Sequence, residues 1–117
     1  MAKRLSLKQA QLIRQHGYIL EKLAKSTARD RKTILQNAPS ELFKALNLIF
    51  RLVANEELEL SKSSRNVIKR HKRLIRSTSK LGTRAIKGRL VRQRGGSLPK
   101  ILSTILPIVG AIVKSVI

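Results

Sequence analysis

Cations dominate the stretch from Lys62 to Arg94, which holds 13 Lys or Arg residues and no Asp or Glu. Such side chains neutralise phosphates and release condensed counterions, which gives an affinity that depends on salt rather than on base sequence. The candidate contacts with duplex DNA or another polyanion are the cations from position 69 onward. They are Lys69, Arg70, Lys72, Arg73, Arg76, Lys80, Arg84, Lys87, Arg89, Arg92 and Arg94.

Aromatic residues are absent from this basic segment. The three in the chain, Tyr18, Phe43 and Phe50, all precede it. Proteins that bind single strands stack the bases on aromatic side chains, so the composition favours a duplex or a generic polyanion as partner. A nuclear-localisation signal or a solvated tail is the alternative, and residues 69–73 would serve it equally well.

The C-terminal segment 97–117 is apolar at helical spacing, with Lys100 and Lys114 on the other face. A large apolar face opposite lysines is typical of a helix that lies in a membrane interface. The longest charge-free run, 101–113, has 13 residues, short of the roughly 20 that cross a bilayer. Packing on the N-terminal helices, self-association or a capsid-protein partner are the alternatives. The predicted membrane-binding residues are Leu98, Ile101, Leu102, Ile105, Leu106, Val109, Ile112, Val113 and Val116.

Helix signals recur through the N-terminal half. Ser6 and Gln9 form a capping-box pattern, and Asp30 can begin a short helical turn. Pro39 opens the clearest helix, which ends near Asn55. Ser61 is the expected cap of a single helix over 62–78, after which 77–94 reads as a largely disordered arm. We find neither an internal repeat nor strand alternation.

The expected fold is therefore all-α, with a small helical N-terminal bundle, a basic disordered or helical arm and a C-terminal amphipathic helix. The corresponding segments are 1–60, 61–96 and 97–117. Residues 1–60 carry a net charge of +5 and residues 61–117 one of +15. There is no cysteine, and His16 and His71 alone make no credible metal site. We expect no enzyme activity and no cofactor.

The helices 39–54 and 62–78 also allow a helix-turn-helix interpretation. Their connection contains Glu56, Glu57 and Glu59, and three carboxylates would face phosphates if that turn lay on DNA. Binding without sequence specificity is therefore the preferred prediction.

At Arg94-Gly95-Gly96-Ser97-Leu98-Pro99 the chain resembles adenovirus late protein X, the precursor of the mu core peptide. Similar small basic proteins occur in adenovirus-like Polinton or Maverick elements. In this family a basic DNA-condensing segment runs into Gly-Gly, then Leu-Pro and an apolar tail. The resemblance covers roughly the last 25–30 residues. It departs from the adenovirus precursor in the helical N-terminal half and in Lys100.

The resemblance implies cleavage by an adenovirus-type cysteine protease. That enzyme recognises Gly-Gly preceded two residues earlier by Met, Ile, Leu, Asn or Gln, which matches Gln93, Gly95 and Gly96 and places the cut before Ser97. A flexible hinge without cleavage is the alternative. The expected function is a non-enzymatic core protein of a virion and host nucleus, which condenses DNA and carries a releasable amphipathic tail. A membrane-lytic peptide precursor and a basic RNA-associated structural protein are the rival hypotheses.

Overall fold

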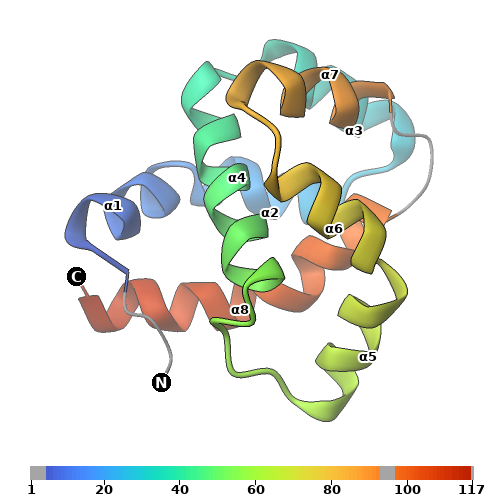
Figure 1. Cartoon of the computed structure of the whole chain (residues 1–117). Helices are drawn as coiled ribbons and strands as arrows, with labels where there is room; N and C mark the ends of the chain where they lie inside the picture. Colours follow the sequence, from blue (N-terminus) through green and yellow to red (C-terminus); the bar gives the residue numbers. More distant parts are fainter. Residues whose placement is uncertain (1–4, 93–96, 117) are drawn as a thin grey trace.

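Helices make up the molecule, and the computed structural model describes residues 5–92 and 97–116. No strand occurs in those two ranges, so the predicted all-α class is confirmed. Figure 1 shows the helices in order: α1 (Leu7–Gln15), α2 (Gly17–Ala24), α3 (Ala28–Asn37), α4 (Ser40–Ala54), α5 (Lys62–Arg70), α6 (Lys72–Ser79), α7 (Thr83–Arg92) and α8 (Ser97–Val116).

Polar caps begin the helices largely as predicted. The Ser6 hydroxyl accepts from the Gln9 N–H at 3.1 Å, and the Gln9 side chain accepts from the Ser6 N–H at 3.0 Å. Ser61 caps α5. The predicted start at Asp30 is wrong: Thr27 caps α3, its hydroxyl accepting from the Asp30 N–H at 3.2 Å. Asp30 instead lies in the first turn, where its negative charge complements the helix dipole.

Both histidines lie at one-residue breaks between consecutive helices. His16 separates α1 from α2 with φ −106°, and His71 separates α5 from α6 with φ −111°. The N–H of each bonds three residues back, to Ile13 at 3.2 Å and to Ile68 at 3.1 Å. The prediction of one helix over 62–78 is therefore wrong, because a tight turn at His71 redirects the chain.

The two halves of the chain repeat each other, which corrects the prediction that no internal repeat exists. Residues 6–37 and 61–92 align without a gap at an offset of 55, and α1 to α3 have the same lengths as α5 to α7. Seven of the 32 aligned positions are identical. They are Ser6 and Ser61, Ile13 and Ile68, His16 and His71, Lys25 and Lys80, Arg29 and Arg84, Lys32 and Lys87, and Leu35 and Leu90.

Burial follows the same repeat. The fourth helices, α4 and α8, continue the alignment at an offset of 56. Five of the nine position pairs that are buried in both halves hold the same residue, and the other four keep their burial with different residues. The positions buried in both halves are Leu20 and Ile75, Leu23 and Thr78, Arg31 and Ile86, Leu35 and Leu90, Leu42 and Leu98, Ala45 and Ile101, Leu46 and Leu102, Ile49 and Ile105, and Val53 and Val109.

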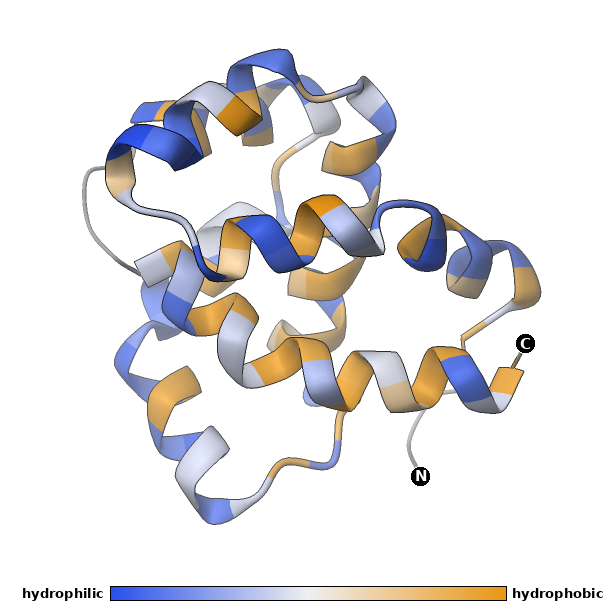
Figure 2. Cartoon of the chain, turned by 180° about the vertical axis from the view of Figure 1, so that it is seen from behind, coloured by the Kyte–Doolittle hydropathy of each residue, from blue (hydrophilic) through white to orange (hydrophobic). Residues whose placement is uncertain are grey.

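The halves pack by exchanging partners. Helix α2 of the first half packs on α8 of the second, and α6 of the second packs on α4 of the first. Helices α3 and α7, which are equivalent, pack on each other. The arrangement approximates a two-fold exchange of halves, although α1 also packs on α8 and α4 on α7. Figure 2 shows hydrophobic positions recurring along α8, and this apolar helix closes the core.

The basic segment is folded into this core, so the prediction of a largely disordered arm over 77–94 is wrong for its described part. Helix α7 occupies Thr83–Arg92, and its Ile86 and Leu90 are fully buried. Two apolar residues four apart suffice because α3 and α4 both pack on α7. One hydrophobic cluster includes residues from 5 to 113, so the boundaries at 60 and 96 mark changes in charge rather than separate cores.

Glu56 adopts a left-handed backbone, with φ 55°, at the end of α4. It follows the predicted stop, Asn55. The Glu56 N–H bonds the Val53 carbonyl at 3.1 Å, and the Glu57 N–H bonds the Leu52 carbonyl at 3.0 Å. These two bonds form the Schellman ending, in which glycine is the usual left-handed residue. A glutamate there carries a steric cost of about 1 kcal/mol or more.

Replacing Glu56 with glycine should therefore stabilise the protein by roughly 0.5–1 kcal/mol, because glycine adopts this conformation without a Cβ clash. Urea unfolding measures the change. Glu56→Ala removes the same charge but keeps the Cβ, so it should give no comparable gain. Equal stabilisation by both variants would show that charge, and not backbone conformation, is the cause.

Candidate nucleic-acid interface

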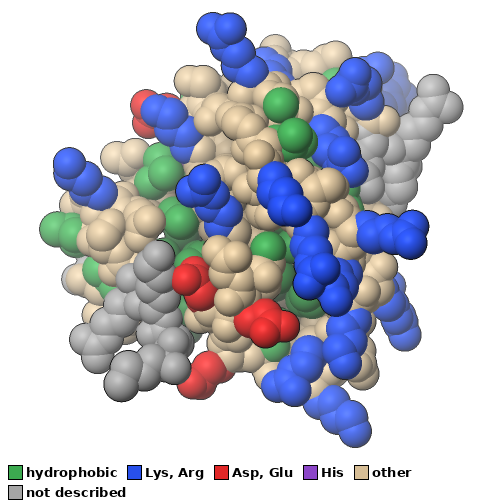
Figure 3. All heavy atoms as spheres, viewed as in Figure 1, with side chains coloured by type: hydrophobic (Ala, Val, Ile, Leu, Met, Phe, Trp, Pro, Cys, Tyr) green, Lys and Arg blue, Asp and Glu red, His purple; other side chains and the backbone are tan. Residues whose placement is uncertain are grey.

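The predicted DNA-binding cations that the structure describes lie on α5, α6 and α7, apart from Lys80, which directly follows α6. Lys87 is half-buried, and Arg94 lies outside the described residues. Figure 3 shows Lys and Arg side chains gathering over the side of the molecule formed by α5, α6 and α7. The structure thus brings together most of the predicted set. The exposed members are Lys69, Arg70, Lys72, Arg73, Arg76, Lys80, Arg84, Arg89 and Arg92.

Amphipathic spacing explains why these cations point outward. On α6, Ile75 and Thr78 are buried and anchor the helix on α4. Residues at other helical angles, such as Arg73 and Arg76, are then directed to solvent. The long side chains cover apolar surface with their methylenes while the charged ends remain in water.

Acidic residues border one part of this surface. A hollow between the α4–α5 connection and helices α5 and α6 is lined by Glu56 and Glu59 and also by Lys69, Lys72 and Arg76. Neighbouring carboxylates lower the positive potential that these cations offer to a phosphate. The three cations are therefore weaker candidates than those on the outer face of α7.

Helix α7 presents a second, shallow groove that is lined by four cations and by Gln36 of α3. No described acidic residue lines this groove. The Lys87 ammonium donates to the Gln36 carbonyl at 3.5 Å and lies 5.8 Å from the centre of the Phe43 ring. The Arg92 Nε donates to the Gly88 carbonyl at 3.0 Å. The four cations are Arg84, Lys87, Arg89 and Arg92.

Neither histidine belongs to a metal-binding group. Within residues 5–92 and 97–116, no three His, Cys, Asp or Glu side chains come together as ligands. His16 and His71 have the same place in the repeat, at the two interhelical breaks. The buried Nε2 of His16 has no hydrogen-bond partner among the described residues.

The predicted membrane-binding face of α8 lies in the protein core. Its three half-buried residues are Leu106, Ile112 and Val116. The helix packs on α1, α2 and α5, and the Ser103 hydroxyl donates to the Ala24 carbonyl at 2.9 Å. In this folded form the apolar face is therefore covered by protein. The buried residues are Leu98, Ile101, Leu102, Ile105, Val109 and Val113.

Helix α8 also has the length and composition of a membrane helix, with 20 residues and a mean hydropathy of 1.5 in its most apolar window. The core helix of a soluble protein meets the same criteria. Pro107 does not end the helix. Because Pro107 is exposed, the backbone carbonyl that it leaves without an N–H partner can be hydrated.

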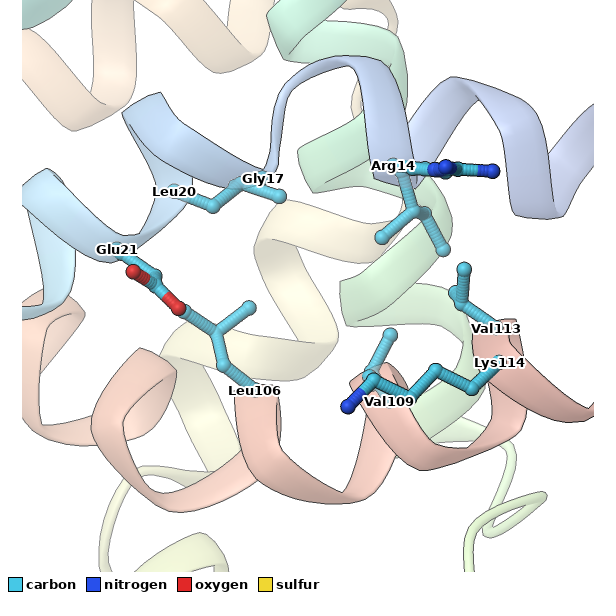
Figure 4. Close-up of a pocket in the computed structure, with 10 residues that line it drawn as sticks. Arg14, Gly17, Leu20, Glu21, Leu106, Val109, Val113 and Lys114 are labelled. Atoms are coloured by element: carbon cyan, nitrogen blue, oxygen red, sulfur yellow. The ribbon is translucent and has the colours of Figure 1, made fainter.

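A hollow of about 590 Å³ lies between α8 and the junction of α1 and α2, beside their packing contacts. Figure 4 shows Leu20 and Val109 in this apolar hollow, and Arg14, Glu21 and Lys114 around it. The repeat relates it to the hollow beside α5 and α6.

The equivalent positions differ in charge between the two hollows. Gly17 and Glu21 of the first hollow correspond to Lys72 and Arg76 of the second. The repeat thus keeps the shape and changes the charge, which makes the second half the more basic one.

The predicted cleavage site lies mostly outside the described residues. Gln93, Gly95 and Gly96 have no described placement, and Ser97 is the first residue of α8. No protein-family model, curated protein or solved structure significantly matches the chain.

Core packing of α8 predicts a large loss of stability on truncating its buried face. Ile105→Ala should cost about 2–5 kcal/mol, because the side chain is fully buried and leaves a cavity. Ile108→Ala, at a half-buried position of the same helix, should cost distinctly less. Urea unfolding of both variants checks the difference. Equally small losses would show that α8 is not part of the folded core.

Proposed function

We propose that the protein binds and condenses duplex DNA without sequence specificity. The observation that supports this most directly is the exposure of nine predicted cations on α5 to α7, a surface whose sequence contains no acid and no aromatic residue. Phosphate contacts fix a protein on DNA but carry no base sequence. The large excess of Lys and Arg therefore favours a protein that contacts the phosphates of DNA and not its bases.

The aromatic residues support duplex over single-strand binding. Phe43 and Phe50 are buried, and Tyr18 is 71% exposed but lies on α2. Within α5 to α7 there is no ring on which an unpaired base could stack. This argues against the alternative of an RNA-associated protein that reads unpaired bases.

The net charge of +20 supports condensation as well as binding. A compact protein of this charge repels its own copies, and a polyanion neutralises that repulsion. Many copies bound to one DNA molecule would in turn neutralise part of its negative charge. We assign the protein to a virion core and the host nucleus on the resemblance to adenovirus late protein X.

The DNA affinity should fall steeply with salt. If about six phosphates are neutralised, log K falls with log salt at a slope of roughly −5. Arg70→Gln combined with Arg73→Gln should flatten the slope by about 1 for each arginine replaced. Fluorescence anisotropy with short duplexes of unrelated sequence measures this.

A matched control removes two positive charges from a different surface. Lys8→Gln combined with Arg14→Gln removes two exposed cations of α1 and should leave the slope close to that of the wild type. A wild-type slope near zero, or strong preference for one sequence, would overturn the proposal. Deleting residues 62–94 or 97–117 is unsuitable as a test, because both segments contribute buried residues to the core.

The tail forms the second part of the proposal. An adenovirus-type protease cuts between Gly96 and Ser97, and the released α8 then acts on a membrane or on a capsid protein. Support comes from Gln93, Gly95 and Gly96, which match the recognition pattern of that protease. Cleavage alone does not expose the apolar face, because six buried residues hold α8 on the other helices.

Two outcomes follow for cleavage. Mass spectrometry should find a cut before Ser97, and replacing Gly95 with tryptophan should prevent it by filling the narrow substrate cleft. After the cut, the two fragments should still elute together in gel filtration and separate only in denaturant. An intact chain beside a cleaved control substrate would reject the site, and fragments that part at once would show that α8 is weakly held.

A further inference from the structure

Within the aligned segments 6–37 and 61–92, three pairs of cations are identical: Lys25 with Lys80, Arg29 with Arg84, and Lys32 with Lys87. The other four identical pairs have structural positions, as caps, apolar contacts or interhelical breaks. Lys25 and Lys80 end α2 and α6, where a cation complements the helix dipole. The remaining two pairs need another explanation.

Arg29 and Lys32 are exposed on α3, and Arg84 is exposed on α7. Residues three apart lie on one side of a helix, so Arg29 and Lys32 share a face. Gln36 continues that face four residues later and lines the cationic groove of α7. The exposed cations of α3 therefore adjoin the groove.

One contact between the helices brings a cation of the α7 groove onto α3. Lys87 of α7 donates to the Gln36 carbonyl of α3 at 3.5 Å. The approximate two-fold exchange relates α3 to α7, so equivalent residues of the two helices take equivalent places on either side of their contact. The acidic Asp30 follows Arg29 directly and is therefore about 100° around the helix from it.

We propose that duplex DNA is bound across the α3–α7 pair, with Arg29 and Lys32 forming the half of the surface that lies outside the basic segment. This inference rests on the proposed DNA binding and extends it to residues of the N-terminal half. Two equivalent helices present equivalent cations to a ligand whose two strands are themselves related by two-fold axes. The first half of the chain is then a DNA-binding element and not only a support for α8.

The test compares Arg29→Gln combined with Lys32→Gln against the α1 control, Lys8→Gln combined with Arg14→Gln. Each double variant removes one Lys and one Arg from exposed positions, so net charge and residue type are matched. Fluorescence anisotropy with a short duplex at several salt concentrations gives the slope of log K against log salt. Circular dichroism verifies that both variants remain helical.

The α3 variant should flatten the slope by about 2, roughly 1 for each lost phosphate contact, while the control changes little. The inference is overturned if the α3 variant has the same slope as the α1 control while Arg70→Gln combined with Arg73→Gln weakens binding. That result leaves the proposed function standing. A wild-type protein without affinity for the duplex overturns both.

Discussion

The two long apolar helices, α4 and α8, impose the constraint on which the rest of the structure depends. Each has an apolar face that must be removed from water, and each is covered largely by the short second helix of the other half. Within its own half each long helix packs mainly on the first helix, α4 on α1 and α8 on α5, and these contacts are less extensive than those with the other half. The halves therefore fold as one unit, although their charges suggest separate segments.

This mutual cover also decides where the charge can lie. Helices α5 to α7 use few apolar residues for packing, such as Ile75, Ile86 and Leu90, because larger apolar faces on α4 and α8 meet them. Most of their surface is left for cations. The acids of the α4–α5 connection lie beside part of this surface, where they reduce repulsion within the protein at the cost of a weaker local field for phosphates.

Local signals predicted the helix ends well. The Ser6 and Ser61 caps, the start of α4 at Pro39 and its stop at Asn55 all depend on residues within a few positions of one another, and all are confirmed. The turn at His71 and the folding of residues 83–92 into α7 depend on residues that are distant in the sequence. Ile86 and Leu90 become a packing face only because α3 and α4 lie against them, which no local window reveals.

No local sequence pattern indicates the repeat either. Its identical residues are widely spaced, and four of its core position pairs differ in residue type, as Leu20 and Ile75 or Arg31 and Ile86 do, while keeping their burial. For the candidate site, the sequence predicted the exposed cations of α5 to α7 but restricted them to one segment. The sequence did not suggest the proposed contacts Arg29 and Lys32, because their neighbourhood is formed by folding, and the alignment of the halves is the signal that points to them.

The apolar face of α8 can serve one environment at a time. In the folded chain it packs on α1, α2 and α5, so a membrane or a capsid protein, the proposed partners, would compete with the core for the same side chains. The apparent affinity for either partner is then reduced by the fraction of molecules in which α8 is released. An isolated peptide of residues 97–117 needs no release from a core. Its membrane affinity would therefore exceed that of the whole protein by the reciprocal of the released fraction. Under the proposed function, cleavage before Ser97 would make release easier without completing it, so loosening of the core, and not the cut alone, would control when the tail acts.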